Sequence, residues 1–175
     1  MQEKKPTDTL PPIRNFDGHD WYSTGIHKRN LPHWELKGST YFISFRVDSK
    51  LGKPFLNVEL AKLMTIILYQ YDQEKYILHA FVVMPDHAHI IIKPIFNNSL
   101  VKIMQNLKGA SAYQINKYLN RSGKFWQSES FDHLIRDSIF LRDKWNYIRD
   151  NPVEARLVNR AEDYPFSSFF NPHID

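Results

Sequence analysis

Two histidines separated by a single residue, His87 and His89, have a spacing that could do chemistry. They follow the turn residues Pro85-Asp86 and precede a run of isoleucines, so the sequence predicts that they open a β-strand. Side chains two positions apart in a strand point to the same face. Two imidazoles on one rigid face can bind a divalent metal ion. The alternative is that both are ordinary polar residues on an open sheet face.

A second pair, Tyr147 and Asn151, lies four positions apart and shares one face if this segment is a helix. A phenol loses its proton only near about pH 10. Beside a metal ion and a phosphodiester, however, it can attack phosphorus and form a covalent adduct. The Asn151 side chain offers a neutral carbonyl oxygen, which suits Mg²⁺ or Mn²⁺. The alternative is a tyrosine packed on the sheet, with Asn151 closing the helix before Pro152.

Basic and aromatic residues interleave from residue 124 onward, in the segments Lys124–Gln127 and Phe131–Arg136. Aromatic rings can stack on unpaired bases, while Lys and Arg meet phosphates. Trp126 could equally belong to the core, and His133 is either a third imidazole or a side chain that points to solvent. The candidate nucleic-acid contacts are Lys108, Lys124, Trp126, Gln127, His133 and Arg136.

The overall charge agrees with such a partner but is weak support alone. The chain has 175 residues and a formal net charge of +4, and residues 98–160 contain 11 Lys and Arg against 6 Asp and Glu. A solvated helical face could give the same count. The absence of Cys excludes disulfides, thiolate metal sites and a Cys nucleophile. Without a long apolar run or a secretory signal, no membrane segment is expected, and the expected location is the cytoplasm.

The segments that carry these residues are predicted to form strands and helices that follow one another along the chain. Strand-like composition marks residues 40–47, 76–84 and 87–93, and more weakly 131–135. Helical spacing marks residues 56–71 and 100–118, the latter capped by Asn98 or Ser99, and a last helix runs from Asp137 or Ser138 to about Asp150, ended by Pro152.

The resulting order, β-α-β-β-α-β-α, matches an α+β, ferredoxin-like (split βαβ) fold. It has an antiparallel sheet with helices on one face, plus an extra C-terminal helix that carries Tyr147. Residues 1–30 have no hydrophobic periodicity and are expected to form an extended arm. The folded domain is expected over residues 31–170, with a short tail at 171–175.

In combination and in order, these motifs resemble the single-tyrosine HUH transposases of the IS200-like family, and most of all the REP-associated tyrosine transposases. The resemblance extends from about Arg29 to Phe169. The segments that carry it are RNLPHWELKGSTYFISFRV, MPDHAHI, KFWQ, FDHLIRD and YIRDNPVEARLV. Ala88 is smaller than the hydrophobic residue that the family often has there, but it is expected to face the other side of the sheet.

The resemblance implies a ferredoxin-like domain that cleaves single-stranded DNA and forms a 5′-phosphotyrosine intermediate. His87 and His89 would bind a divalent metal ion, Mg²⁺ or Mn²⁺. Tyr147 would be the nucleophile and Asn151 the third ligand, with Tyr113 and Tyr118 as competing tyrosines. The implied partner is single-stranded DNA with hairpin (palindromic) elements, bound by a monomer or a homodimer.

Two functions from other classes stay open at this point. A ferredoxin-like nucleic-acid-binding module without catalysis would expose aromatic rings on its sheet and need no metal. A small metal hydrolase would use the two histidines and be indifferent to the loss of the Tyr147 hydroxyl.

Overall fold

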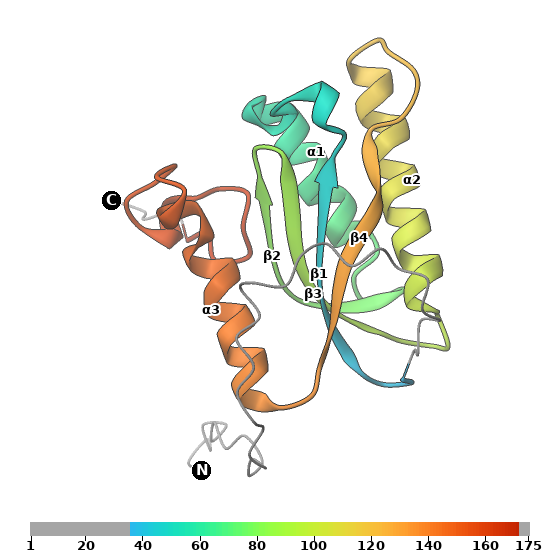
Figure 1. Ribbon diagram of the computed structural model, residues 1–175, viewed down its shortest axis with the longest axis vertical. Coiled ribbons are helices and arrows are strands. Elements are labelled where there is room, and N and C mark those ends of the chain that lie inside the picture. The colour runs from blue at the N-terminus through green and yellow to red at the C-terminus, as the bar shows by residue number, and fades with distance from the viewer. Residues whose placement is uncertain (1–35, 172–175) are drawn as a thin grey trace, which may run out of the picture.

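The computed structural model describes residues 36–171 (Figure 1). The expected N-terminal arm, the first residues of the expected domain and residues 172–175 lie outside the described part. The strands and helices are β1 (Thr40–Val47), α1 (Val58–Gln70), β2 (Tyr76–Met84), β3 (His87–Pro94), α2 (Leu100–Tyr118), β4 (Trp126–Ile135) and α3 (Ser138–Glu154).

A capping side chain precedes the first residue of each of the helices α1, α2 and α3. The Ser99 hydroxyl accepts a hydrogen bond from the Lys102 N–H at the start of α2, and the Asp137 carboxylate accepts one from the Phe140 N–H at the start of α3. Asn57 caps α1 in the same way, by accepting from the Glu59 N–H. This cap explains why α1 begins two residues later than the apolar spacing predicts.

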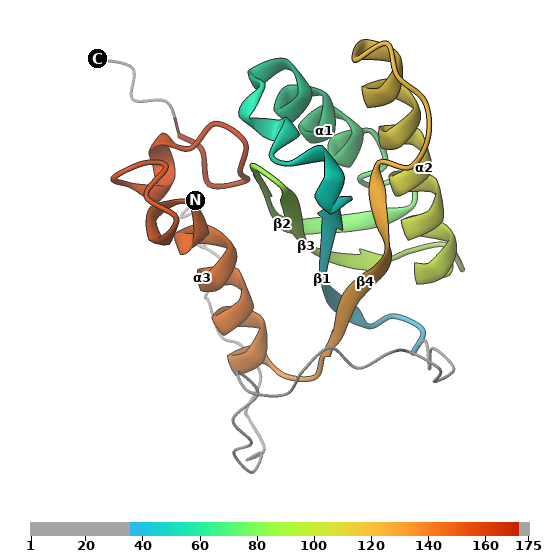
Figure 2. The same cartoon turned by 45° about the horizontal axis from the view of Figure 1, so that its top comes forward.

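The sheet confirms the ferredoxin-like prediction. All neighbouring strands are antiparallel, and their order is β2-β3-β1-β4, so the two motif-bearing central strands are β1 and β3. Helices α1 and α2 cover one face, and α3 lies across the other (Figure 2). The arrangement therefore matches the expected one, with two helices on one face of the sheet and an additional helix after β4.

Strand alternation divides the apolar residues between two cores. Ile43, Phe45 and Ile90 point toward α1 and α2, where they form the larger core. Phe42 and Ile91, one position along, pack toward α3 in a second core that includes Ile148 and Tyr164. Ile148 is fully buried, and this anchors α3 on the sheet.

Two other predicted boundaries, of β4 and α3, were also wrong. β4 begins at Trp126 rather than at Phe131, because a bulge between Phe45 and Val47 lets the pairing continue to Val47 and Trp126. Pro152 does not end α3, which runs to Glu154. A proline removes only one N–H donor, and the helix continues because the Ala155 N–H still reaches the Asn151 carbonyl at 3.0 Å.

The segment after α3 returns to the outer edge of β2. The Val83 N–H donates to the Phe166 carbonyl at 2.8 Å, and the Tyr164 hydroxyl donates to the Val83 carbonyl at 2.8 Å. These bonds cover an edge that would otherwise expose unpaired backbone groups. None of the helices formed by residues 36–171 is long and apolar enough to cross a bilayer.

Candidate active site

The two motif histidines lie on the sheet face that α3 covers. His87 and His89 pair with Arg46 and Ser44 across β1, and paired residues of neighbouring strands share a face. The centroids of the two imidazole rings are 4.7 Å apart. Ala88 lies between them and is buried in the opposite core, as expected from strand alternation.

A carboxylate orients the first histidine. Asp86 Oδ1 lies 2.6 Å from Nδ1 of His87, and a carboxylate can only accept there, so Nδ1 carries the proton and Nε2 keeps its lone pair when the ring is neutral. Arg46 Nη1 lies 3.4 Å from the other oxygen of Asp86. Burial lowers the pKa of His87, and the bond to Asp86 opposes this only in part. The ring is therefore neutral near pH 7 and presents one nitrogen.

The second histidine is more deeply buried, with 4% of its surface exposed, and it stacks on Phe42 with 5.5 Å between centroids and 19° between planes. Burial holds the pKa of His89 well below its usual range, and the nearby His87 and Arg46 lower this pKa further. No group in the described residues hydrogen-bonds to its buried Nδ1. A neutral imidazole is the form that binds a metal ion.

Tyr147 approaches these histidines from α3. Its Oη lies 3.4 Å from Nε2 of His89, and its ring meets Phe42 edge to face at 6.0 Å. The competing tyrosines Tyr113 and Tyr118 are 70% and 54% exposed on α2, which covers the opposite sheet face. Of these three candidate tyrosines, only Tyr147 contacts a motif histidine.

The residues beside Tyr147 include side chains that could bind a divalent metal ion. Asn151 is half-buried one helical turn after Tyr147, on the same side of α3. Within residues 36–171, no three His, Cys, Asp or Glu side chains converge on one point, so a third protein ligand would have to be of another type, such as the amide of Asn151. Two neutral imidazoles and an amide oxygen could together hold a divalent metal ion, and they would leave coordination positions for water or phosphate.

Three residues of this site escaped the sequence analysis. Asp86 was assigned only to a turn, and Phe42 and Lys144 were not singled out. A signal existed for each: Asp86 directly precedes the histidines, Phe42 is on the strand face that alternation places toward α3, and Lys144 is three residues before Tyr147.

Trp126 lies away from the site and inside the core, as the alternative for this residue anticipated. It is 4% exposed, its ring meets Phe45 at 4.8 Å, and its indole N–H donates to the Ser111 hydroxyl at 2.9 Å. Trp126 lines the groove between α2 and β4, but little of its surface is exposed, and this burial argues against the predicted stacking on DNA bases.

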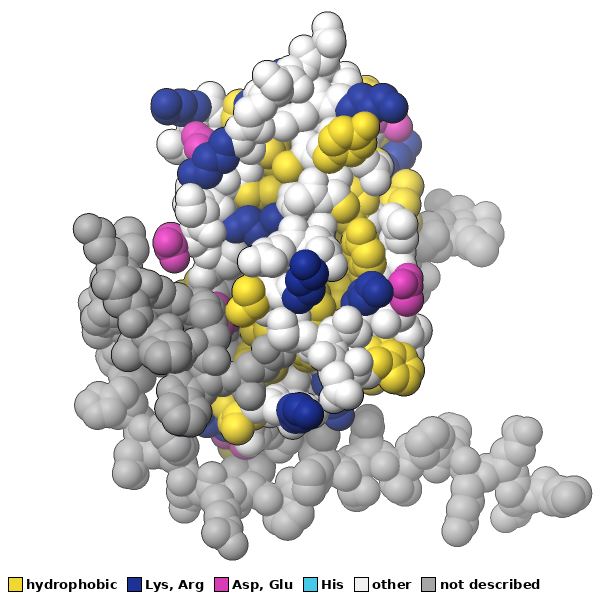
Figure 3. Space-filling view, turned by 90° about the vertical axis from the view of Figure 1, so that its right-hand side faces the viewer, with side chains coloured by type: hydrophobic (Ala, Val, Ile, Leu, Met, Phe, Trp, Pro, Cys, Tyr) yellow, Lys and Arg dark blue, Asp and Glu magenta, His cyan; other side chains and the backbone are white. Residues whose placement is uncertain are grey.

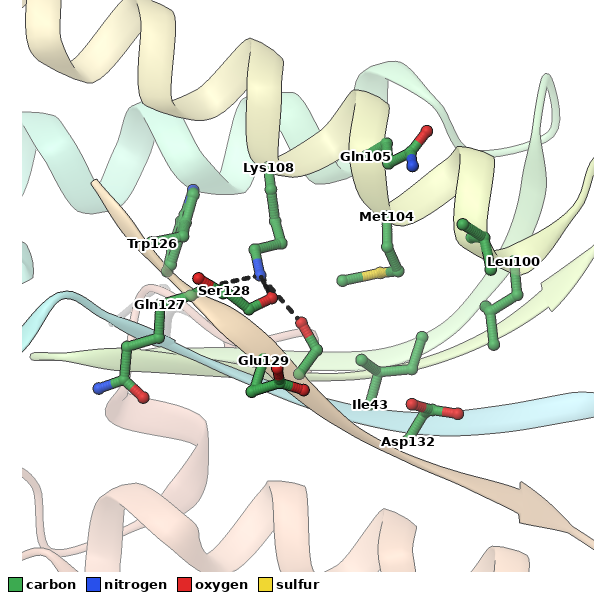
Figure 4. Close-up of a pocket in the computed structure, with 12 residues that line it drawn as sticks. Ile43, Leu100, Met104, Gln105, Lys108, Trp126, Gln127, Ser128, Glu129 and Asp132 are labelled. Atoms are coloured by element: carbon green, nitrogen blue, oxygen red, sulfur yellow. Dashed lines mark hydrogen bonds between the residues drawn. The ribbon is translucent and has the colours of Figure 1, made fainter. Parts of the chain in front are cut away.

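Lys108 and Gln127 line a groove of about 510 Å³ between α2 and β4, on the sheet face opposite the histidines. Figure 3 shows this side of the molecule, where apolar side chains gather between Lys and Arg residues. Lys108 Nζ reaches down from α2 and donates to the Gln127 carbonyl at 2.7 Å, the Ser128 carbonyl at 3.2 Å and the Ser130 hydroxyl at 3.1 Å (Figure 4). Its three donors thus tie α2 to the edge strand β4.

The remaining predicted DNA contacts lie at opposite ends of β4, with Lys124 before its start and His133 and Arg136 near its end. Lys124 is exposed, and its Nζ lies 3.7 Å from Asp48. His133 shares the sheet face of the motif histidines through its pairing with Phe42, but it lies on β4, with β1 between it and those histidines. Arg136 is exposed at the end of β4. The structure does not gather these residues into one patch.

Comparisons with known proteins identify relatives of this chain. The family model described as "Transposase IS200 like" matches residues 50–150. A Haemophilus influenzae relative is 26% identical over 143 residues, which are 76% of this chain and 81% of that protein. The REP-associated tyrosine transposase of Escherichia coli K12 is 25% identical over 137 residues, covering 77% and 78% of the two chains. A solved REP-associated tyrosine transposase bound to a REP hairpin shares the fold, with a TM-score of 0.64 at 23% identity, over 81% of this chain and 83% of that one.

Proposed function

The chain belongs to the IS200-like transposase family, and from this membership we propose that it cuts and rejoins single-stranded DNA beside a hairpin through a covalent bond to Tyr147. The observation that supports Tyr147 is its phenol oxygen, 3.4 Å from Nε2 of His89. The hairpin substrate is extended to this chain from the REP hairpin in the solved relative.

In the cleavage step, Tyr147 Oη bonds to the scissile phosphorus, and the bond from phosphorus to the 3′-oxygen of the preceding nucleotide breaks. The phenol proton leaves to solvent, and the departing 3′-oxygen takes up a proton. The products are a 5′-phosphotyrosine and a free 3′-OH. A 3′-OH that later attacks the same phosphorus reverses these changes, so rejoining needs no outside energy source.

The other residues of the site have distinct roles in this proposal. His87, His89 and Asn151 would hold a divalent metal ion, which polarises the scissile phosphate and offsets its charge when bound. Asp86 fixes the His87 ring with Nε2 available. Phe42 packs against both His89 and Tyr147 and so keeps the nucleophile and one ligand in a fixed relation.

The other residues predicted to contact DNA remain part of the proposal. Lys124, His133 and Arg136 would meet DNA phosphates or bases, whereas Lys108 and Gln127 act first within the protein, through their bonds at β4. These separate placements imply that DNA is held along several surfaces of the domain rather than in one basic patch.

The test is incubation of the purified chain with end-labelled single-stranded DNA hairpins and Mn²⁺, followed by denaturing electrophoresis. The proposal expects a protein–DNA band that resists denaturation, requires Mn²⁺ and is retained in Tyr113→Phe. A non-catalytic binding module gives no covalent band under any condition. A small metal hydrolase would give no adduct but would turn over a small substrate.

A further inference from the structure

Phe131 is an exposed aromatic residue on the sheet face that carries the two motif histidines. It pairs with Ser44 on β1, and Ser44 pairs with His89 on β3, so these three side chains share one face. Neighbouring strands lie about 4.8 Å apart, which places the Cα of Phe131 about 10 Å from that of His89. The ring is therefore within reach of a nucleotide that flanks a phosphate held at the histidines.

The folded core does not include this ring. Ile135, four residues further along β4, packs against the core beneath α3, whereas Phe131 belongs to neither core and is 47% exposed. A single exposed apolar side chain is common on protein surfaces and needs no explanation by itself. The position of Phe131 beside the proposed active site and its support by a second ring are what distinguish it.

His133 provides that support. It lies two positions along β4 on the same face, its ring centroid is 4.4 Å from that of Phe131, and the two planes meet at 34°. On its other side, the His133 ring lies 6.1 Å from the ring of Phe140 on α3. This row of rings, which begins on α3, holds Phe131 in one orientation and presents a preformed aromatic surface.

A cation lies on the same face, next to the histidines. Arg46 pairs with His87 across β1 and β3, and its side chain is 57% exposed although Nη1 contacts Asp86 at 3.4 Å. A single strand that runs from the histidines toward β4 would pass this guanidinium with its phosphates and Phe131 with its bases. Alternating contacts to phosphates and to base faces are typical of proteins that bind single strands.

We propose that Phe131 stacks on the unpaired base of a nucleotide that flanks the scissile phosphate, and so holds the single strand across β1 while Tyr147 reacts. This inference rests on the proposed function, because that function places the phosphate at the histidines. Every base has a face on which a ring can stack, so Phe131 would position the strand without selecting its sequence.

The test uses hairpin DNA with a single-stranded flank that carries the fluorescent base 2-aminopurine at one flank position at a time. Binding is measured in Tyr147→Phe, so that no DNA is consumed, and the cleavage position is mapped with the wild type. Phe131→Leu removes the aromatic ring and Phe131→Tyr keeps it. Tyr113→Leu is the matched control, because it removes a 70% exposed ring from α2, on the opposite side of the sheet.

We expect the fluorescence of one position next to the cleavage site to fall on binding, and this fall to disappear in Phe131→Leu and persist in Phe131→Tyr. Hairpin affinity should decrease by about 10-fold in Phe131→Leu and remain unchanged in Tyr113→Leu. An abasic nucleotide at the same position removes the same contact, so its effect and that of Phe131→Leu should not add. Urea unfolding should be nearly unchanged in Phe131→Leu, since the ring belongs to neither core.

Unchanged affinity in Phe131→Leu, additive losses from the abasic nucleotide and the variant, or a fluorescence change that does not depend on Phe131 would overturn the stacking contact. Failure of the wild type to form a covalent adduct would instead overturn the proposed function. The two failures are distinguishable because the binding measurements require no cleavage.

Discussion

Asp86 Oδ1 lies 2.6 Å from Nδ1 of His87, and this contact fixes which nitrogen of the imidazole is available to a metal ion. A ligand histidine whose other nitrogen donates to a carboxylate is held in one tautomer and one orientation. The turn that precedes β3 therefore does more than reverse the chain. It supplies the carboxylate that sets the tautomer of His87, as the proposed metal site requires.

Replacing this carboxylate tests its role. Asp86→Asn keeps the size of the side chain but no longer accepts as an anion, so we expect Mn²⁺ affinity to fall by about 10-fold or more. Isothermal calorimetry measures this without DNA. Glu74→Gln, at an exposed position before β2, is the control and should bind Mn²⁺ like the wild type. Unchanged affinity in Asp86→Asn would show that Asp86 does not orient the ligand.

Trp126 should contribute to stability rather than to DNA binding. Trp126→Phe removes the hydrogen bond to Ser111 and leaves a void beside Phe45, so we expect a loss of about 2–4 kcal/mol in the free energy of unfolding. Hairpin affinity of the folded fraction should stay the same. Urea unfolding and fluorescence anisotropy measure the two quantities, and Trp145→Phe, at a 41% exposed position, should cost less stability. A variant that is stable but binds DNA weakly would restore Trp126 as a contact.

Stability should fall in mild acid because of the buried histidines. Burial lowers the pKa of His89 in the folded chain, whereas in the unfolded chain it protonates near its ordinary value of about 6.5. Below that pH the unfolded state binds more protons, so the free energy of unfolding decreases as pH falls, by up to about 1.4 kcal/mol per pH unit for each such group. His87, whose pKa is also lowered by burial, acts in the same direction, and the exposed His79 contributes less.

Urea unfolding between pH 7.5 and pH 5 in the presence of a chelator checks this expectation. The neutral variant His89→Gln should lose part of the pH dependence while His79 and His87 retain theirs. An identical pH dependence in the variant and the wild type would contradict the assignment of a buried neutral imidazole at position 89.

Much of the fold follows from the sequence because its signals are local. β-branched and aromatic composition predicts β1 and β2, and the helical spacing after Ser99 predicts both ends of α2. Strand alternation also predicts that His87 and His89 share a face, which depends on nothing beyond the strand itself.

The remaining site features depend on contacts between distant segments. Whether Trp126 stacks on a base or fills the core depends on α2, which supplies Ser111, and residue type alone does not distinguish these roles. A lysine is normally expected on the surface, yet the Lys108 ammonium donates a hydrogen bond to a backbone carbonyl of β4. Lys144 becomes conspicuous only when α3 is placed on the sheet next to Phe42.

Asn151 should have a graded effect. If its amide oxygen completes the proposed metal site, Asn151→Ala should weaken Mn²⁺ binding and slow adduct formation without abolishing it, because two imidazoles remain. Asn159→Ala, at an exposed position after α3, is the control and should match the wild type in both measurements. Wild-type Mn²⁺ affinity and rate in Asn151→Ala would remove Asn151 from the ligand set.

The measurement that tests the central claim most directly is peptide mass spectrometry of the protein–DNA adduct, made with the wild type and with Tyr147→Phe. The variant keeps the ring that packs on Phe42 and loses only the hydroxyl, so its stability and hairpin affinity should be close to those of the wild type. The account predicts that the nucleotide mass is found on the peptide containing Tyr147 and that Tyr147→Phe forms no adduct. An adduct on Tyr113 or Tyr118, or undiminished adduct in Tyr147→Phe, would contradict it.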